Sequence, residues 1–99
     1  MKIILQNLTL SEAVVKIKRC GYAQLLDAKT GQISFVRRLS GYQYPRFHIY
    51  LGEDKRGQLF YNLHLDQKKP SYKGARAHSG EYEGEVIEQE VARLKKLIG

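Results

Sequence analysis

The stretch that decides the fold is RFHIYLGEDKRGQLFYNLHLD, residues 46–66, because it contains two predicted strands and the loop that joins them. Apolar and polar residues alternate over residues 46–51 and again over 58–66, and this period of two is typical of β-strands. The intervening residues 52–57 are polar and begin and end with glycine, as hairpin loops often do. The stretch therefore predicts an antiparallel hairpin.

Strand alternation divides the hairpin into an apolar face and a polar face. The apolar face, predicted to be core, carries Phe47, Ile49, Leu51, Leu59, Tyr61, Leu63 and Leu65. The opposite face carries Arg46, His48, Tyr50, Phe60, Asn62, His64 and Asp66. If the loop runs over residues 54–58, His48 lies opposite His64, whereas a register shifted by two places Arg46 opposite His64. Both registers bring the two imidazoles onto one surface.

The remaining elements are predicted from caps and from apolar periodicity. Thr9 and Glu12 have the spacing of a capping box at the start of a helix over 10–20, and an apolar stripe with helical spacing predicts a second helix over 84–98. Further strands are predicted over 2–6, 22–27 and 32–39, with a hairpin turn at 28–31. Residues 1–99 then form a single α+β domain with an antiparallel sheet of four or five strands. The N-terminal and C-terminal helices are expected to pack on one face, leaving the other open.

Composition narrows the class of protein. A hydrophobic content of 42% and a charged content of 27% are close to globular averages, which argues against a disordered, collagen-like or coiled-coil chain. The longest apolar run, residues 3–5, is far too short to span a bilayer, and no leader is recognised. With Cys20 as the only cysteine, no internal disulfide can form, and we expect a cytoplasmic protein in which Cys20 is a packed residue.

The charge distribution points to a polyanionic partner. The chain has a formal net charge of +7, and residues 1–80 hold 14 basic and five acidic side chains. Within them, the segment 67–80 is basic, lacks acidic residues and is long for a loop. We expect its cations to contact phosphates and Tyr72 to stack on bases. Alternatively, this segment pairs with the acidic run 81–90, in the same chain or in a neighbour.

The polar face of the hairpin carries the candidate chemistry. His48 and His64 are predicted as a catalytic acid–base pair for metal-independent cleavage of a phosphodiester. The predicted nucleic-acid contacts are Arg46, Tyr50, Asn62, Lys68, Lys69, Tyr72, Lys73 and Arg76. Ligand binding without chemistry, and a polar face without a function, remain open. A metal site also remains open, with ligands from His64, Asp66 and His78 or Glu81 and with His48 to complete it, although the spacing matches no metal signature and no cofactor is predicted.

Two short motifs resemble the HicA-like toxins, which are built on the double-stranded RNA-binding fold. KIKRCGY, residues 16–22, is similar to the end of the first helix in that family, and FHIY, residues 47–50, is similar to the strand that carries its catalytic histidine. His48 occupies the matching position. The resemblance implies cleavage of RNA and a cognate antitoxin partner.

These observations predict a small nucleic-acid-binding protein that prefers RNA to DNA. The preference follows from exposed tyrosines on a sheet, which suit unpaired bases, and from the lack of a recognition helix in the sequence. Whether the protein is a ribonuclease is left open. The alternative is a non-enzymatic interaction domain, or a homodimer, whose open sheet face is a protein interface.

Overall fold

The structure is a computed structural model that describes residues 1–26, 31–67, 80–81 and 84–98. The strands are β1 (Lys2–Ile4), β2 (Ala23–Leu26), β3 (Ile33–Arg38), β4 (Arg46–Glu53), β5 (Leu59–Asp66) and β6 (Gly80–Glu81). The helices are α1 (Leu10–Arg19) and α2 (Glu85–Ile98). Every predicted strand and helix is present, with ends that differ from the prediction by at most two residues.

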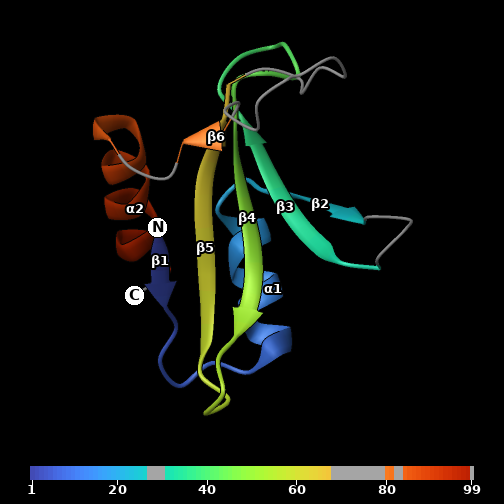
Figure 1. Cartoon of the computed structure of the whole chain (residues 1–99), viewed down its shortest axis with the longest axis vertical. Helices are drawn as coiled ribbons and strands as arrows, with labels where there is room; N and C mark the ends of the chain where they lie inside the picture. The colour runs from blue at the N-terminus through green and yellow to red at the C-terminus, as the bar shows by residue number, and fades with distance from the viewer. Residues whose placement is uncertain (27–30, 68–79, 82–83, 99) are drawn as a thin grey trace.

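The strands form one antiparallel sheet in the order β1-β5-β4-β3-β2, and the short β6 pairs with the end of β5 (Figure 1). The predicted α+β class and the antiparallel sheet are therefore confirmed, with five strands along the main path. Sequence reasoning did not predict β6, because two residues are too few to show a period. The predicted turn at 28–31 lies mostly outside the described residues.

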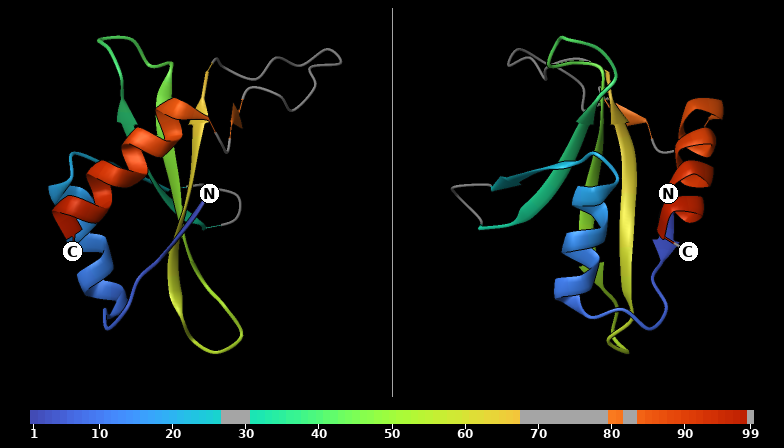
Figure 2. Two further views of the ribbon diagram at one scale, coloured as in Figure 1. Left: turned by 90° about the vertical axis from the view of Figure 1, so that its left-hand side faces the viewer. Right: turned by 180° about the vertical axis from the view of Figure 1, so that it is seen from behind.

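Both helices lie on the same side of the sheet, as Figure 2 shows from two directions. The core fills the space between them and the apolar face of the hairpin. Its buried residues are Ile3, Leu5, Ala13, Ile17, Cys20, Tyr22, Phe35, Phe47, Ile49, Leu59, Tyr61, Leu63, Leu65, Ile87, Val91 and Leu94. Tyr61 is fully buried, and its hydroxyl donates a hydrogen bond to the carbonyl of Ala13 at 2.6 Å, which joins α1 to β5. Neither described helix is long and apolar enough to cross a membrane.

The predicted capping box is present at the start of α1. The Thr9 hydroxyl accepts from the amide of Glu12 at 3.1 Å, and the Glu12 carboxylate accepts from the amide of Thr9 at 2.9 Å. Two amides at the helix start thereby gain partners without help from the rest of the fold. This local pattern explains why the start of the helix could be read from the sequence.

The β4–β5 hairpin adopts the first of the two registers considered above. His48 pairs directly with His64, and Arg46 pairs with Asp66. The loop sets this register, because one carboxylate oxygen of Asp54 accepts hydrogen bonds from the amides of Arg56 and Gln58 at 2.8 and 2.9 Å. This pairing determines which side chains meet on the polar face.

A buried carboxylate fastens α2 to the sheet. Glu90 is 3% exposed and accepts hydrogen bonds from Arg37 of β3, Arg93 of its own helix and the hydroxyl of Tyr22, the last at 2.5 Å. Arg93 also donates to the carbonyl of Cys20 at the end of α1. The Glu90 cluster (Glu90, Tyr22, Arg37 and Arg93) therefore joins both helices to β3. Burial alone would raise the pKa of Glu90, but its hydrogen bonds with Arg93, Arg37 and Tyr22 outweigh burial and lower that pKa.

We expect Glu90→Gln to lower the free energy of unfolding by about 2 to 3 kcal/mol at neutral pH, because two guanidinium groups lose their shared anion while they remain partly solvated. Because the folded-state pKa is lowered, the wild-type advantage is fully present above the ordinary glutamate pKa of 4.5 and is lost as the pH falls below it. Urea unfolding at neutral pH and at several values below 4.5 measures both effects.

The matched control is Glu88→Gln, which makes the same change at an exposed position of the same helix. We expect it to leave stability within about 0.5 kcal/mol of the wild type. If the difference in free energy of unfolding between the wild type and Glu90→Gln does not decrease at acid pH, the assigned role of the Glu90 carboxylate is contradicted.

Candidate functional site

No described helix covers the side of the sheet that faces away from α1 and α2, which we call the helix-free face (Figures 1 and 2). Directly paired residues of neighbouring strands lie on the same face of a sheet, so the registers identify its members. They include Lys2, Ser34, Arg38, Arg46, His48, Tyr50, Phe60, Asn62, His64 and Asp66. The polar hairpin face predicted from the sequence is therefore the central part of this surface.

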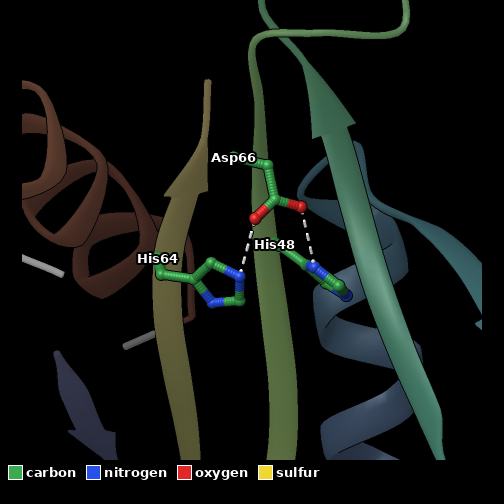
Figure 3. Close-up of side chains that lie close together, drawn as sticks. All are labelled: His48, His64 and Asp66. Atoms are coloured by element: carbon green, nitrogen blue, oxygen red, sulfur yellow. Dashed lines mark hydrogen bonds and ion pairs between the residues drawn. The ribbon is translucent and has the colours of Figure 1, made fainter. Parts of the chain in front are cut away.

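Asp66 joins the two histidines. One carboxylate oxygen of Asp66 lies 3.0 Å from Nδ1 of His48, and the other lies 2.8 Å from Nε2 of His64 (Figure 3). The ring centroids of the two imidazoles are 4.8 Å apart. Because a carboxylate oxygen accepts, each of these ring nitrogens carries a proton in the contact. We call His48, His64 and Asp66 the imidazole–carboxylate cluster.

The Asp66 carboxylate is held in its ionised form. Burial raises the pKa of Asp66, but the hydrogen bonds and charges of His48 and His64 lower it by more, so the net shift is downward. The guanidinium of Arg46 adds a further contact, with Nε 3.3 Å from the oxygen that also faces His48. Asp66 is therefore an anion at neutral pH, with donors on both oxygens.

Ser34 of β3 extends the cluster. Its Oγ lies 2.9 Å from Nε2 of His48. If His48 carries one ring proton, on Nδ1, then Nε2 accepts from this hydroxyl, and if both nitrogens are protonated Nε2 donates to it; in both cases Ser34, His48 and Asp66 form one hydrogen-bonded chain. Ser34, His48 and Asp66 follow one another in the order of the nucleophile, base and orienting carboxylate of a catalytic triad. Ser34 is only 7% exposed, however, so the hydroxyl cannot be reached by a substrate carbonyl in this conformation.

The two histidines lie on the face that was predicted to be open, but they are buried there. His48 is 8% exposed and His64 is 6% exposed. Tyr50 packs beside both rings: the centroid of its ring lies 4.6 Å from that of His48 and 5.7 Å from that of His64, and it is nearly parallel to the latter. Alternation predicted the direction of these side chains but not how closely neighbouring rings would cover them.

The other end of the helix-free face is aromatic and cationic. The ring of Phe60 lies over Gly52, its partner on β4, where a Cβ atom would approach the ring to 2.5 Å. Nζ of Lys2 lies 4.5 Å from the centre of the same ring. The absence of a side chain at Gly52 therefore leaves room for the end of the ring, and Lys2 adds a positive charge beside it.

The predicted nucleic-acid residues fall into two groups. Arg46, Tyr50 and Asn62 lie on the helix-free face and are partly buried, with Arg46 paired to Asp66 and Asn62 accepting from the amino group of Met1 at 3.4 Å. The others lie outside the described residues: Lys68, Lys69, Tyr72, Lys73 and Arg76. The same holds for His78, whereas Glu81 pairs with β5 as part of β6.

Sequence reasoning missed the contributions of β1 and β3 to this face. Ser34, Arg38 and Lys2 are placed there by the pairing of β3 with β4 and of β1 with β5. Alternation within each strand was visible in the sequence. Which strands are neighbours, and in which register, was not, because no short turn of recognisable type joins them.

We expect Asp66→Ala to reduce the free energy of unfolding by about 3 kcal/mol, because two buried imidazoles and the guanidinium of Arg46 lose their common acceptor. Ser34→Ala removes a single hydrogen bond and should cost about 1 kcal/mol. Urea unfolding of both variants at neutral pH tests the difference. If Asp66→Ala costs no more than Ser34→Ala, the carboxylate is not what holds the two histidines.

The chain was compared with known proteins in three ways. A scan against protein-family models, a search of curated proteins and a search of solved structures each found no match. The resemblance to HicA-like toxins therefore stays a prediction. The function is inferred from the side chains of the helix-free face.

Proposed function

We propose that the protein binds nucleic acid on its helix-free face and prefers single-stranded RNA to duplex DNA. The observation that carries the proposal is the combination, on one sheet surface, of half-buried aromatic rings with cations that form no ion pair with another described residue. Tyr50 and Phe60 supply the rings, and Lys2 and Arg38 supply the cations at the two edges of the β5–β4–β3 surface.

The charges on this face favour a polyanion. Arg38 lies directly opposite Arg46, and like charges in such a pair repel each other. Arg46 is compensated by Asp66, whereas exposed Arg38 forms no ion pair with another described residue. A phosphate group beside Arg38 would remove the repulsion. In the sequence, Lys68 and Lys69 follow the end of β5 closely, so they add to the positive charge that a bound strand would meet.

The aromatic rings favour unpaired bases. A base that stacks on an aromatic side chain gains about 1 to 3 kcal/mol, and every base has a suitable face. The ammonium of Lys2 lies over the ring of Phe60. A base that stacks on this ring would displace the ammonium, and Lys2 could then contact a phosphate. A flat sheet with rings and edge cations is a common platform for single-stranded RNA.

Cleavage of the bound RNA by His48 and His64 remains a second proposal. The cluster favours it in one respect, since Asp66 links two imidazoles that can exchange protons. Proton transfer to a ribose hydroxyl or a leaving oxygen would require His48 to release Ser34 or Asp66. Binding needs no such rearrangement, so it is the primary proposal. A cognate antitoxin and a cytoplasmic location belong with the cleavage proposal.

A protein interface is the other class of function that a specific feature supports. β2 ends the strand order, all four of its residues are exposed, and Leu26 is 66% exposed. An exposed edge strand of this kind can pair with a second chain. Such pairing along β2 would give a homodimer or a complex with another protein. It would leave the helix-free face accessible to a nucleic acid.

We expect fluorescently labelled single-stranded RNA to bind in fluorescence anisotropy, more tightly than duplex DNA of equal length, with an affinity that falls steeply as salt increases. Arg38→Gln should weaken binding and reduce the slope of log affinity against log salt by about 1. Arg56→Gln is the matched control, because Arg56 is also exposed but lies in the β4–β5 loop. No binding at low salt would exclude the proposal.

Phe60→Leu tests the stacking contribution in the same assay. We expect a loss of affinity of about 1 to 3 kcal/mol at a fixed salt concentration, with an unchanged salt slope, because no charge is removed. Gel analysis of the same samples detects cleavage. Cleavage by the wild type that is lost in His48→Gln, with binding retained, would add the ribonuclease function. Intact RNA would leave a binding domain.

A further inference from the structure

We propose that His48, His64 and Asp66 form a binding site for a divalent transition-metal ion of the zinc type. The inference goes beyond nucleic-acid binding, because it concerns the cluster alone and its test requires no RNA. It rests on three observations: three ligand atoms converge, hydrogen bonds from Ser34 and Arg46 orient two of the ligand residues, and the two imidazoles are buried.

The ligand atoms already converge. Each of the three residues offers one atom, and these atoms lie within 4.8 Å of one another. In a tetrahedral zinc site with bonds of about 2.0 to 2.2 Å, ligand atoms lie about 3.3 to 3.5 Å apart. The contacts of Asp66 with the two imidazoles, at 3.0 and 2.8 Å, are shorter than this. Ligand atoms that now lie up to 4.8 Å apart would have to approach by as much as about 1.3 to 1.5 Å, whereas the two Asp66 contacts would lengthen slightly. With these shifts the three ligands surround an ion, which takes the place of the two shared protons.

The groups behind the ligands suit a metal site. A histidine that binds a metal through one nitrogen usually donates from the other to a fixed acceptor. If His48 binds through Nδ1, its proton moves to Nε2 and is donated to Oγ of Ser34, which lies 2.9 Å away. On Asp66, Oδ2 is contacted by Nε of Arg46 and by Nδ1 of His48, whereas Oδ1 is contacted by Nε2 of His64, so Oδ1 is the oxygen that can turn to an ion while Arg46 holds Oδ2. The same contacts that order the cluster would thus orient its ligands.

The fold makes the site stiff. His48 and His64 are direct partners on β4 and β5, the most extensively paired strands of the sheet, and both are under 10% exposed. Ligands on paired strands are held more precisely than ligands on loops. Three protein ligands also leave one tetrahedral position for water or for an oxygen of a bound ligand.

The donor set selects among ions. Two imidazole nitrogens and one carboxylate suit Zn²⁺, Co²⁺ or Ni²⁺, whereas Mg²⁺ and Ca²⁺ prefer sites made of oxygen atoms. Because of this donor set, we expect the site to be selective for transition metals. The positive charge of Arg46 lowers the affinity of the site for every cation.

The test uses the full chain without an affinity tag, treated with a chelator and then dialysed. Calorimetry with Zn²⁺ should show one ion per chain, Co²⁺ should give the visible absorption of a tetrahedral site, and Mg²⁺ should give no signal. Asp66→Asn and His64→Gln keep polar groups of similar size but each removes a ligand, so each should weaken Zn²⁺ binding about 100-fold or more. Glu88→Gln, the matched change at an exposed helix position, should bind like the wild type.

Two results would overturn the proposal: a folded wild type that binds neither Zn²⁺ nor Co²⁺, or folded ligand variants that bind as tightly as the wild type. If a variant does not fold by circular dichroism, NMR of the wild type decides. The imidazole resonances of His48 and His64 should change together as Zn²⁺ is added, and unchanged resonances would also overturn the proposal. Failure of RNA binding would leave this result unaffected, since no nucleic acid is present.

Discussion

The register between β4 and β5 is the constraint on which the rest of the structure depends. It is set by the loop in which Asp54 accepts hydrogen bonds from two amides, and it places His48 opposite His64 and Arg46 opposite Asp66. A slip of one residue would exchange the two faces, bringing imidazoles into the core and apolar side chains to the helix-free face. The same pairing therefore determines both which residues form the core and which residues form the candidate site.

Two carboxylates, buried Glu90 and half-buried Asp66, lie on opposite sides of the sheet and use that framework in the same way. Glu90 gathers Tyr22 and two arginines on the helix side, and Asp66 gathers two histidines and Arg46 on the other side. In each case one anion satisfies several donors, which is why both carboxylates stay ionised despite burial. The difference lies in the donors. Arginines around Glu90 keep their protons, whereas the histidines around Asp66 can give theirs up, so only the second cluster can exchange protons for another cation.

The sequence predicted what depends on local patterns. Alternation in residues 46–66 predicted the hairpin, its two faces and the shared surface of His48 and His64, and the Thr9–Glu12 spacing predicted the start of α1. Contacts between distant segments were not predicted. Ser34 meets His48 because β3 pairs with β4, and Glu90 meets Tyr22 across 68 residues of chain. Neither the depth of burial of the imidazoles nor the role of Asp66 as their common acceptor has a signature in spacing alone.

The contact between Phe60 and Gly52 has a consequence for how the sequence can diverge. Because a Cβ atom at position 52 would overlap the ring, any larger residue there is compatible only with a smaller side chain at position 60 or with a ring that is displaced from the strand. Across related sequences, the two positions should therefore change together. A lineage that gains a side chain at 52 should carry a smaller residue at 60, whereas an aromatic ring packed against the strand at 60 should be found with glycine at 52.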